Sequence, residues 1–147
     1  MSRTLPSRLA LLFAGFLPLA AVAEYRTVES ATVLYDTPSL KGVKRYVVRR
    51  DTPLEVILTL GEMAKVRDSE GSITWIEKGA LSNRRTVIVK AERASVFKKP
   101  EEGASLSFEA DHNVSLAYVE TVPGGWIKVR HSDGQEGFVR AGQVWGF

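Results

Sequence analysis

A weak internal duplication constrains the fold of this chain more than any other feature. Residues 65–76 align without gaps on residues 128–139, sharing lysine, valine, arginine, serine and glycine at matching positions. Each of these segments ends in an aromatic residue followed by an aliphatic one. Two shorter matches lie upstream: residues 34–38 with 96–100, and 51–54 with 111–114. Because the spacing drifts as changes of loop length would make it, we expect two copies of one small fold.

The pattern within each copy is that of short strands separated by tight turns. Residues 114–118 alternate apolar with polar or small side chains, which is the period of a half-buried strand. Glycine beside acidic residues and serine marks tight turns at residues 69–71 and 132–134. Beyond the first 23 residues, no segment shows a long helical period of apolar residues. We therefore predict an all-β chain of two small antiparallel β-barrels.

The two barrels are expected to lie against each other. A unit of about 60 residues buries only a modest core and is marginally stable alone. Residues 86–89 (Thr-Val-Ile-Val) are strand-like and too apolar for a flexible linker, so we interpret them as the connection.

The first 23 residues have the pattern of a secretory signal peptide. Arg3 and Arg8 precede an uncharged run at residues 9–23, which ends in the small residues that a signal peptidase prefers. The run is shorter than the roughly 20 residues of a membrane-spanning helix. We predict a signal peptide at residues 1–23, a first barrel at 24–83 and a second barrel at 84–147, with no stable membrane insertion after cleavage.

Charge and cysteine content narrow the classes of partner and chemistry. The chain of 147 residues has a formal net charge of +3 and no cysteine. Removal of residues 1–23 takes away two arginines and no acid, which leaves a net charge of +1. Near-neutral charge and an export signal disfavour nucleic acid as a partner. Without cysteine, the chain has no disulfides, thiolate nucleophiles or cysteine-containing zinc sites.

The histidines give no sign of a catalytic or metal site. His112 and His131 fall at turn-like positions that are not repeated between the copies. Neither has the neighbouring ligands of a metal site or the spacing of a catalytic triad. We therefore expect no catalytic residues, no metal and no cofactor.

The second copy carries motifs of a known family. They are Lys98-Lys99-Pro100, then Gly-Trp-Ile-Lys-Val at residues 125–129, and Gly-Gln-Glu-Gly-Phe-Val at residues 134–139. In this order they resemble the bacterial SH3-like (SH3b) domain, particularly the tandem form of small exported proteobacterial proteins. The first copy departs from the family, because Glu62-Met63 replaces the Gly-Trp pair and Thr74 the second glycine. The resemblance implies a small β-barrel binding module of the cell envelope, which many relatives attach to cell-wall hydrolases.

Two aromatic residues of the second copy are candidate ligand contacts. If Ile127 and Val129 face the core, Trp126 is partly exposed, because side chains alternate along a strand. Trp126 would then stack on a sugar ring or an extended peptide, with Tyr118 on the partner strand as the other wall. The structural alternative is that Trp126 covers the end of the barrel.

We assign packing roles to the other aromatic residues that the copies share or that lie near the end of the chain. Tyr35 and Phe97 occupy matching positions, as do Trp75 and Phe138. We expect Trp145 and Phe147 to seal the second barrel.

A basic stretch in the first copy is the other candidate contact. Five cations lie within ten residues, with no acid before Asp51: Lys41, Lys44, Arg45, Arg49 and Arg50. Such a stretch attracts the carboxylates of peptidoglycan stem peptides, acidic proteins or anionic headgroups. The alternative is a solvated edge strand whose charges prevent aggregation.

These observations favour a non-enzymatic binding module in the periplasm. We predict that it recognises peptidoglycan or its stem peptide, with contacts from Trp126, Tyr118, Lys44, Arg45, Arg49 and Arg50. The alternative is an adaptor that binds another envelope protein along an exposed barrel edge or groove. A hydrolase with a carboxylate pair is a further alternative, although no spacing in the sequence indicates such a pair.

Overall fold

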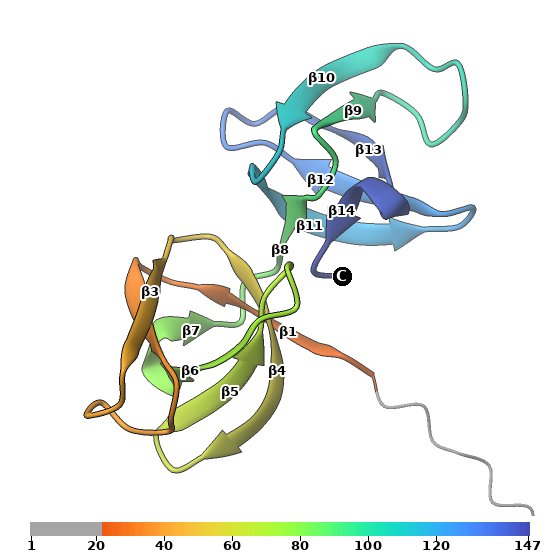
Figure 1. The fold of residues 1–147 in the computed structure, drawn as a ribbon. Helices are drawn as coiled ribbons and strands as arrows, with labels where there is room; N and C mark the ends of the chain where they lie inside the picture. The colour runs from red at the N-terminus through yellow and green to blue at the C-terminus, as the bar shows by residue number, and fades with distance from the viewer. Residues whose placement is uncertain (1–21) are drawn as a thin grey trace, which may run out of the picture.

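The protein consists of two antiparallel β-sheets of seven strands each (Figure 1). The computed structural model describes residues 22–147, so the predicted signal peptide lies outside this part of the chain except for its last two residues. The first sheet contains β1 (Glu24–Val28), β2 (Thr32–Tyr35), β3 (Lys44–Val48), β4 (Pro53–Leu60), β5 (Met63–Arg67), β6 (Ile73–Glu77) and β7 (Leu81–Ser82). A single 3-10 turn, η1 (Lys78–Ala80), precedes β7.

The second sheet contains the same kinds of element in the same order as the first. It contains β8 (Thr86–Val89), β9 (Arg93–Phe97), β10 (Leu106–Asp111), β11 (Ser115–Val122), β12 (Trp126–Arg130), β13 (Glu136–Arg140) and β14 (Val144–Trp145). The 3-10 turn η2 (Ala141–Gln143) precedes β14 as η1 precedes β7. Residues 22–147 include no helix with the length and hydrophobicity needed to cross a membrane.

The two sheets repeat one topology. The hydrogen-bonded order is β3-β2-β6-β5-β4-β1-β7 in the first and β10-β9-β13-β12-β11-β8-β14 in the second. Each strand of the second sheet therefore takes the place of the strand seven positions earlier. Figure 1 shows the sheets as two curled bodies, one above the other. The predicted all-β fold of two tandem antiparallel barrels is confirmed.

Each barrel encloses its own apolar core. The core side chains come from inward-facing strand positions and are buried. They include Val28, Leu34, Leu54, Val66 and Ile76 in the first barrel, and Val87, Val96, Ile127, Val129 and Val139 in the second. Burial of one such side chain stabilises the fold by about 1.5–3 kcal/mol relative to its exposure. The alternation of apolar residues in the sequence therefore determines which face of each strand is buried.

The observed register corrects one of the sequence alignments. Asp51 and Asn113 have nearly the same positive φ, 65° and 64°. Each donates its backbone N–H to the first strand of its own barrel, to the carbonyls of Val28 and Val89 respectively, at 2.9 Å. The two residues are therefore equivalent, and the alignment of residue 51 with residue 111 was wrong by two positions.

The alignment of the later strands holds in the structure. Met63 lies opposite Glu77 in the first barrel, and Trp126 lies opposite Arg140 in the second. Both pairs join the fifth and sixth strands of their barrel, so Met63 occupies the place of Trp126, as the sequence predicted.

Residues 86–89 are not the connection between the barrels. They form β8, the first strand of the second barrel, which pairs with β11 and β14. All four side chains of β8 are buried, which explains their apolar character. The chain passes from one sheet to the other through residues 83–85 alone.

Candidate binding site at the barrel junction

Trp126 is buried, and the prediction that it is partly exposed was wrong. Its side chain is only 3% exposed. The Arg140 guanidinium lies 4.0 Å from the ring centroid, and the Phe97 ring meets it edge to face at 6.0 Å. Strict alternation fails at the start of β12, where Trp126 and Ile127 are both buried. The indole therefore acts in packing and offers no free face to a ligand.

Tyr118 does not form a groove with Trp126. On β11, Tyr118 lies opposite Val129, whereas Trp126 lies opposite Val122. The two side chains start about 10–13 Å apart along the strands, at roughly 3.3 Å per residue. The Tyr118 ring instead stacks on Arg85 at the junction, and its hydroxyl lies 2.9 Å from Thr121 Oγ1.

The structure divides the basic stretch into two groups. Lys44 and Arg45 lie on β3, a strand at the edge of the first sheet, and both are exposed. Arg49 and Arg50 follow β3 in the turn before β4, where they face the second barrel. Only this second group belongs to a recessed surface.

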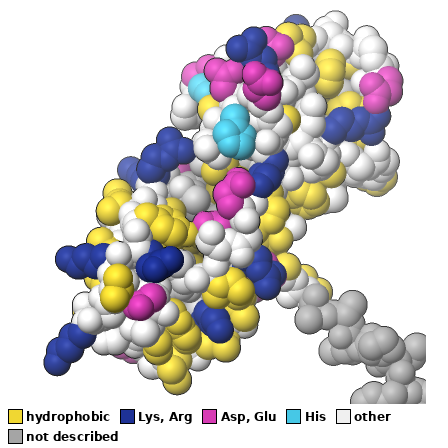
Figure 2. Space-filling view, viewed as in Figure 1, with side chains coloured by type: hydrophobic (Ala, Val, Ile, Leu, Met, Phe, Trp, Pro, Cys, Tyr) yellow, Lys and Arg dark blue, Asp and Glu magenta, His cyan; other side chains and the backbone are white. Residues whose placement is uncertain are grey.

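Two adjoining hollows between the barrels form what we call the junction groove. Their volumes are about 290 and 310 Å³, and both are lined by Asp51, Ser115 and Ser132. The other charged or imidazole side chains that line them are Arg49, Arg50, Arg84, His112, Arg130 and His131. In Figure 2, basic, acidic and histidine side chains gather where the two bodies meet.

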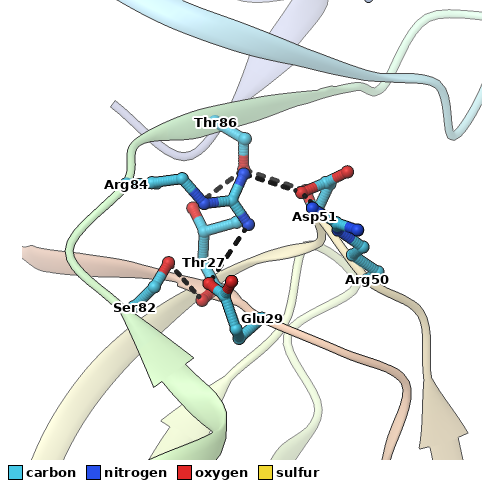
Figure 3. A network of polar contacts seen from close by, with 7 residues as sticks. All are labelled: Thr27, Glu29, Arg50, Asp51, Ser82, Arg84 and Thr86. Carbon is cyan, nitrogen blue, oxygen red and sulfur yellow. Dashed lines mark hydrogen bonds and ion pairs between the residues drawn. The ribbon is translucent and has the colours of Figure 1, made fainter.

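Asp51 organises the first-barrel side of the junction groove (Figure 3). Its carbonyl accepts a hydrogen bond from Thr86 Oγ1 at 2.9 Å, and this hydroxyl lies 3.1 Å from Thr27 Oγ1. Arg84 donates from Nη1 to Asp51 Oδ1 at 2.9 Å and from Nη2 to Glu29 Oε2 at 3.4 Å. The hydrogen bond that Arg84 donates to Asp51 raises the pKa of Arg84, so this guanidinium stays charged. These contacts join residues of the first barrel to the connection and to β8.

Two of the groove arginines are neutralised by nearby acids. Arg84 is shared between Asp51 and Glu29, and Arg130 pairs with Glu136 at 2.5 Å. The hydrogen bond and the charge of Arg130 lower the pKa of Glu136, which keeps this carboxylate ionised. Both arginines therefore have fixed positions and contribute little net positive charge.

Arg49 and Arg50 supply the excess charge of the groove. Arg49 Nη2 donates to a neutral acceptor, the backbone carbonyl of Asn113 in the second barrel, at 3.0 Å. Arg50 Nε lies 3.7 Å from Asp51, whose carboxylate already pairs with Arg84. A carboxylate ligand would gain charge-assisted hydrogen bonds from these two side chains, with the hydroxyls of Ser115 and Ser132 within the same recess.

A separate set of aromatic contacts joins the barrels around Arg85. Its guanidinium lies 4.9 Å from the Tyr118 ring centroid and 5.6 Å from that of Tyr25, and Nη2 donates to the Gly146 carbonyl at 3.2 Å. Tyr25 meets Trp145 edge to face at 5.1 Å. Trp145, which was expected only to seal the second barrel, thus also contacts the first.

Arg84, Arg130 and both histidines also line the groove, although they were not among the residues predicted to bind a ligand. His112 takes the place of Arg50 in the repeat, and His131 takes the place of Asp68. These departures from the repeat were the signal that the sequence offered for the two histidines. Within residues 22–147, no group of three or more histidine, aspartate or glutamate side chains is placed to hold a metal ion.

Comparison with known proteins identifies both halves of the chain with one family. The family model of the bacterial SH3 domain matches residues 28–83 and again residues 90–146. No curated protein matches the chain.

Solved structures that match the chain include three described as NlpC or NlpC/P60 proteins. NlpC2 from Trichomonas vaginalis matches with a TM-score of 0.39 at 15% identity, covering 84% of this chain and 48% of that one. NlpC1 from the same organism matches with a TM-score of 0.37 at 12% identity, covering 95% of this chain and 51% of that one. An NlpC/P60 family protein from Bacillus cereus matches with a TM-score of 0.37 at 14% identity, covering 83% of this chain and 56% of that one. The chain spans about half the length of these structures.

Proposed function

This chain belongs to the bacterial SH3 domain family, and on that basis we propose that it is a non-enzymatic binding module of the cell envelope, exported to the periplasm. Its ligand is peptidoglycan, recognised through the carboxylates of the stem peptides. The membership of both halves in one family supports the class of function, and the cationic junction groove supports the chemistry of the ligand.

The excess charge of Arg49 and Arg50 is the observation that carries the proposed ligand. Both guanidiniums face a recess of about 310 Å³, in which Asp51 is the one carboxylate among the lining residues. A stem peptide is short, extended and rich in carboxylates, so it matches a recess with cations at one side. Arginine suits this role because its planar group can bind both oxygens of a carboxylate.

Co-sedimentation with intact peptidoglycan sacculi across a salt series tests the proposal. We expect Arg50→Gln to weaken binding about tenfold, which corresponds to the loss of one charge-assisted hydrogen bond. Lys99→Gln is the matched control. This substitution removes the same charge from the loop at residues 98–105, which lines a different recess. Wild-type binding should fall as salt screens the ion pairs.

Two results would contradict the proposal in different ways. Equal loss of binding in the two variants would place the ligand outside the junction groove. Absence of sedimentation at low salt would exclude peptidoglycan and favour an envelope protein as the partner. Trp126→Ala is unsuited to this test, because removal of a buried indole costs about 3–5 kcal/mol of stability.

A further inference from the structure

The two sheets expose equivalent edge strands of opposite charge. β3 and β10 each stand at the end of the strand order of their sheet, so one side of each has no neighbouring strand. They hold the same place in the repeated topology. Residues 41–48, which include β3, contain three cations and no acid. Residues 101–111, which include β10, contain four acids and no lysine or arginine.

The charged side chains on both edges are accompanied by exposed aliphatic ones. Lys44 and Arg45 are exposed on β3, next to Val47, which is 62% exposed. On β10, Glu109 and Asp111 are exposed, and Leu106 is 48% exposed. An open sheet edge with exposed apolar side chains favours pairing with a strand of another chain. Val47 and Leu106 are such side chains, and neither is covered by its own barrel.

The acids of β10 are not fully neutralised within the barrel. Asp111 Oδ1 accepts a hydrogen bond from Arg93 Nε of the neighbouring strand at 2.9 Å. Glu109 has no ion pair within residues 22–147. Lys44 and Arg45 likewise have no ion pair in this part of the chain. The net charges of the two edges therefore face solvent and remain available to a partner.

We propose that the protein forms a two-fold dimer in which β3 of each copy pairs, strand to strand, with β10 of the other. Figure 1 shows β3 at the left of the lower body and β10 at the top of the upper one. In a two-fold dimer, each contact of β3 with the other copy's β10 is matched by a contact of β10 with the other copy's β3. Such an assembly closes, because both edges of both copies are used.

Charge determines which edges pair in this dimer. Main-chain hydrogen bonds supply the attraction common to any two strand edges, and burial of Val47 and Leu106 adds to it. Pairing of β3 with β3, or of β10 with β10, would place like charges opposite each other and is disfavoured. The dimer does not depend on what the junction groove binds, since neither β3 nor β10 contributes a lining residue to that groove.

Sedimentation velocity with two charge-reversed variants tests this pairing in the protein purified from cells that express the full chain. The wild type should dimerise at low salt, with a dissociation constant that rises at least tenfold in high salt. Lys44→Glu/Arg45→Glu has two acidic edges, and Glu109→Lys/Asp111→Lys has two basic edges, so each should be monomeric alone. An equimolar mixture should form a heterodimer, because each acidic edge then meets a basic one.

The mixing step separates pairing from damage to the fold, since a misfolded variant would not regain a partner. Lys78→Glu and Glu77→Lys change single charges beside η1, away from both edge strands, and should leave the wild-type dimer intact. A wild type that remains monomeric at low salt, or a mixture that stays monomeric, would overturn the proposal. Retention of a dimer by either charge-reversed variant alone would also overturn it.

Discussion

A single pair of positions shows how the two copies have kept one contact with different chemistry. In the first barrel, Tyr46 donates a hydrogen bond from its hydroxyl to Asp68 Oδ2 at 2.6 Å. At the equivalent positions of the second barrel, the Phe108 ring lies 5.5 Å from the His131 ring. In both cases the third strand is joined to the turn between the fifth and sixth. A polar pair makes this contact in one barrel, and an aromatic pair makes it in the other.

The Tyr46 hydroxyl makes the alkaline stability of the first barrel pH-dependent. Burial, followed by the hydrogen bond to Asp68, raises the pKa of Tyr46 from 10.0 to about 12. The unfolded chain ionises near pH 10 while the native phenol stays protonated, so this contribution is complete below pH 10 and is lost as the pH rises toward 12.

We expect Tyr46→Phe to lower the free energy of unfolding by about 1 kcal/mol near neutral pH, through loss of one hydrogen bond. The variant should also show a smaller decline in stability between pH 10 and 12 than the wild type. Urea unfolding at a series of pH values measures both effects. An identical alkaline slope in the two proteins would contradict the assignment.

At the scale of elements, β13 differs from its counterpart β6 at one crowded position. A Cβ added to Gly137 would lie 2.6 Å from the Phe97 carbonyl oxygen and 2.7 Å from Val96 Cγ1. The equivalent residue in the first barrel is Thr74, whose side chain is buried. The close approach of β9 therefore leaves no space for a side chain at Gly137.

We predict that Gly137→Ala destabilises the protein by about 1–3 kcal/mol, because the side chain has no space beside β9. Gly142→Ala is the matched control, since a Cβ there meets nothing within 4 Å. The control should change stability by no more than about 0.5 kcal/mol. Thermal or urea unfolding of the two variants provides the comparison, and equal stabilities would refute the steric argument.

The elements themselves were largely predictable from sequence, whereas the candidate site was not. Alternation and turn residues indicated strands such as β11 and β12, because these signals are local. The buried face of Trp126 was not predictable, because it depends on Arg140 and Phe97, which are far away in the sequence. Arg49 and Arg50 were identified by their charge, but their separation from Lys44 and Arg45 depends on where β3 ends.

At the scale of the whole molecule, the barrels are joined too closely to behave as independent units. A Cβ on Gly146 would lie 2.9 Å from Pro53 Cβ of the first barrel and 3.0 Å from the Thr86 carbonyl oxygen. The residue also has a φ of 113°, which favours glycine. Together with the contacts of Arg84 and Arg85, this close approach fixes the orientation of one barrel on the other.

We expect Gly146→Val to separate the unfolding of the two barrels. The wild type should unfold in one cooperative transition by calorimetry, since each barrel stabilises the other across the junction. The variant should lose about 1–3 kcal/mol through backbone strain and steric overlap, and should show two transitions. Gly142→Val, in an open position, should unfold as the wild type does. A single transition in Gly146→Val would contradict this coupling.

The three tryptophans occupy three different environments, so their intrinsic fluorescence can report on three regions of the molecule. Trp75 lies under Lys65 in the first barrel, Trp126 under Arg140 inside the second, and Trp145 against Tyr25 at the junction. Replacing any two of them by phenylalanine leaves one indole whose fluorescence reports a single region. The loosening of each barrel, and of the contact between them, can thus be observed separately in solution.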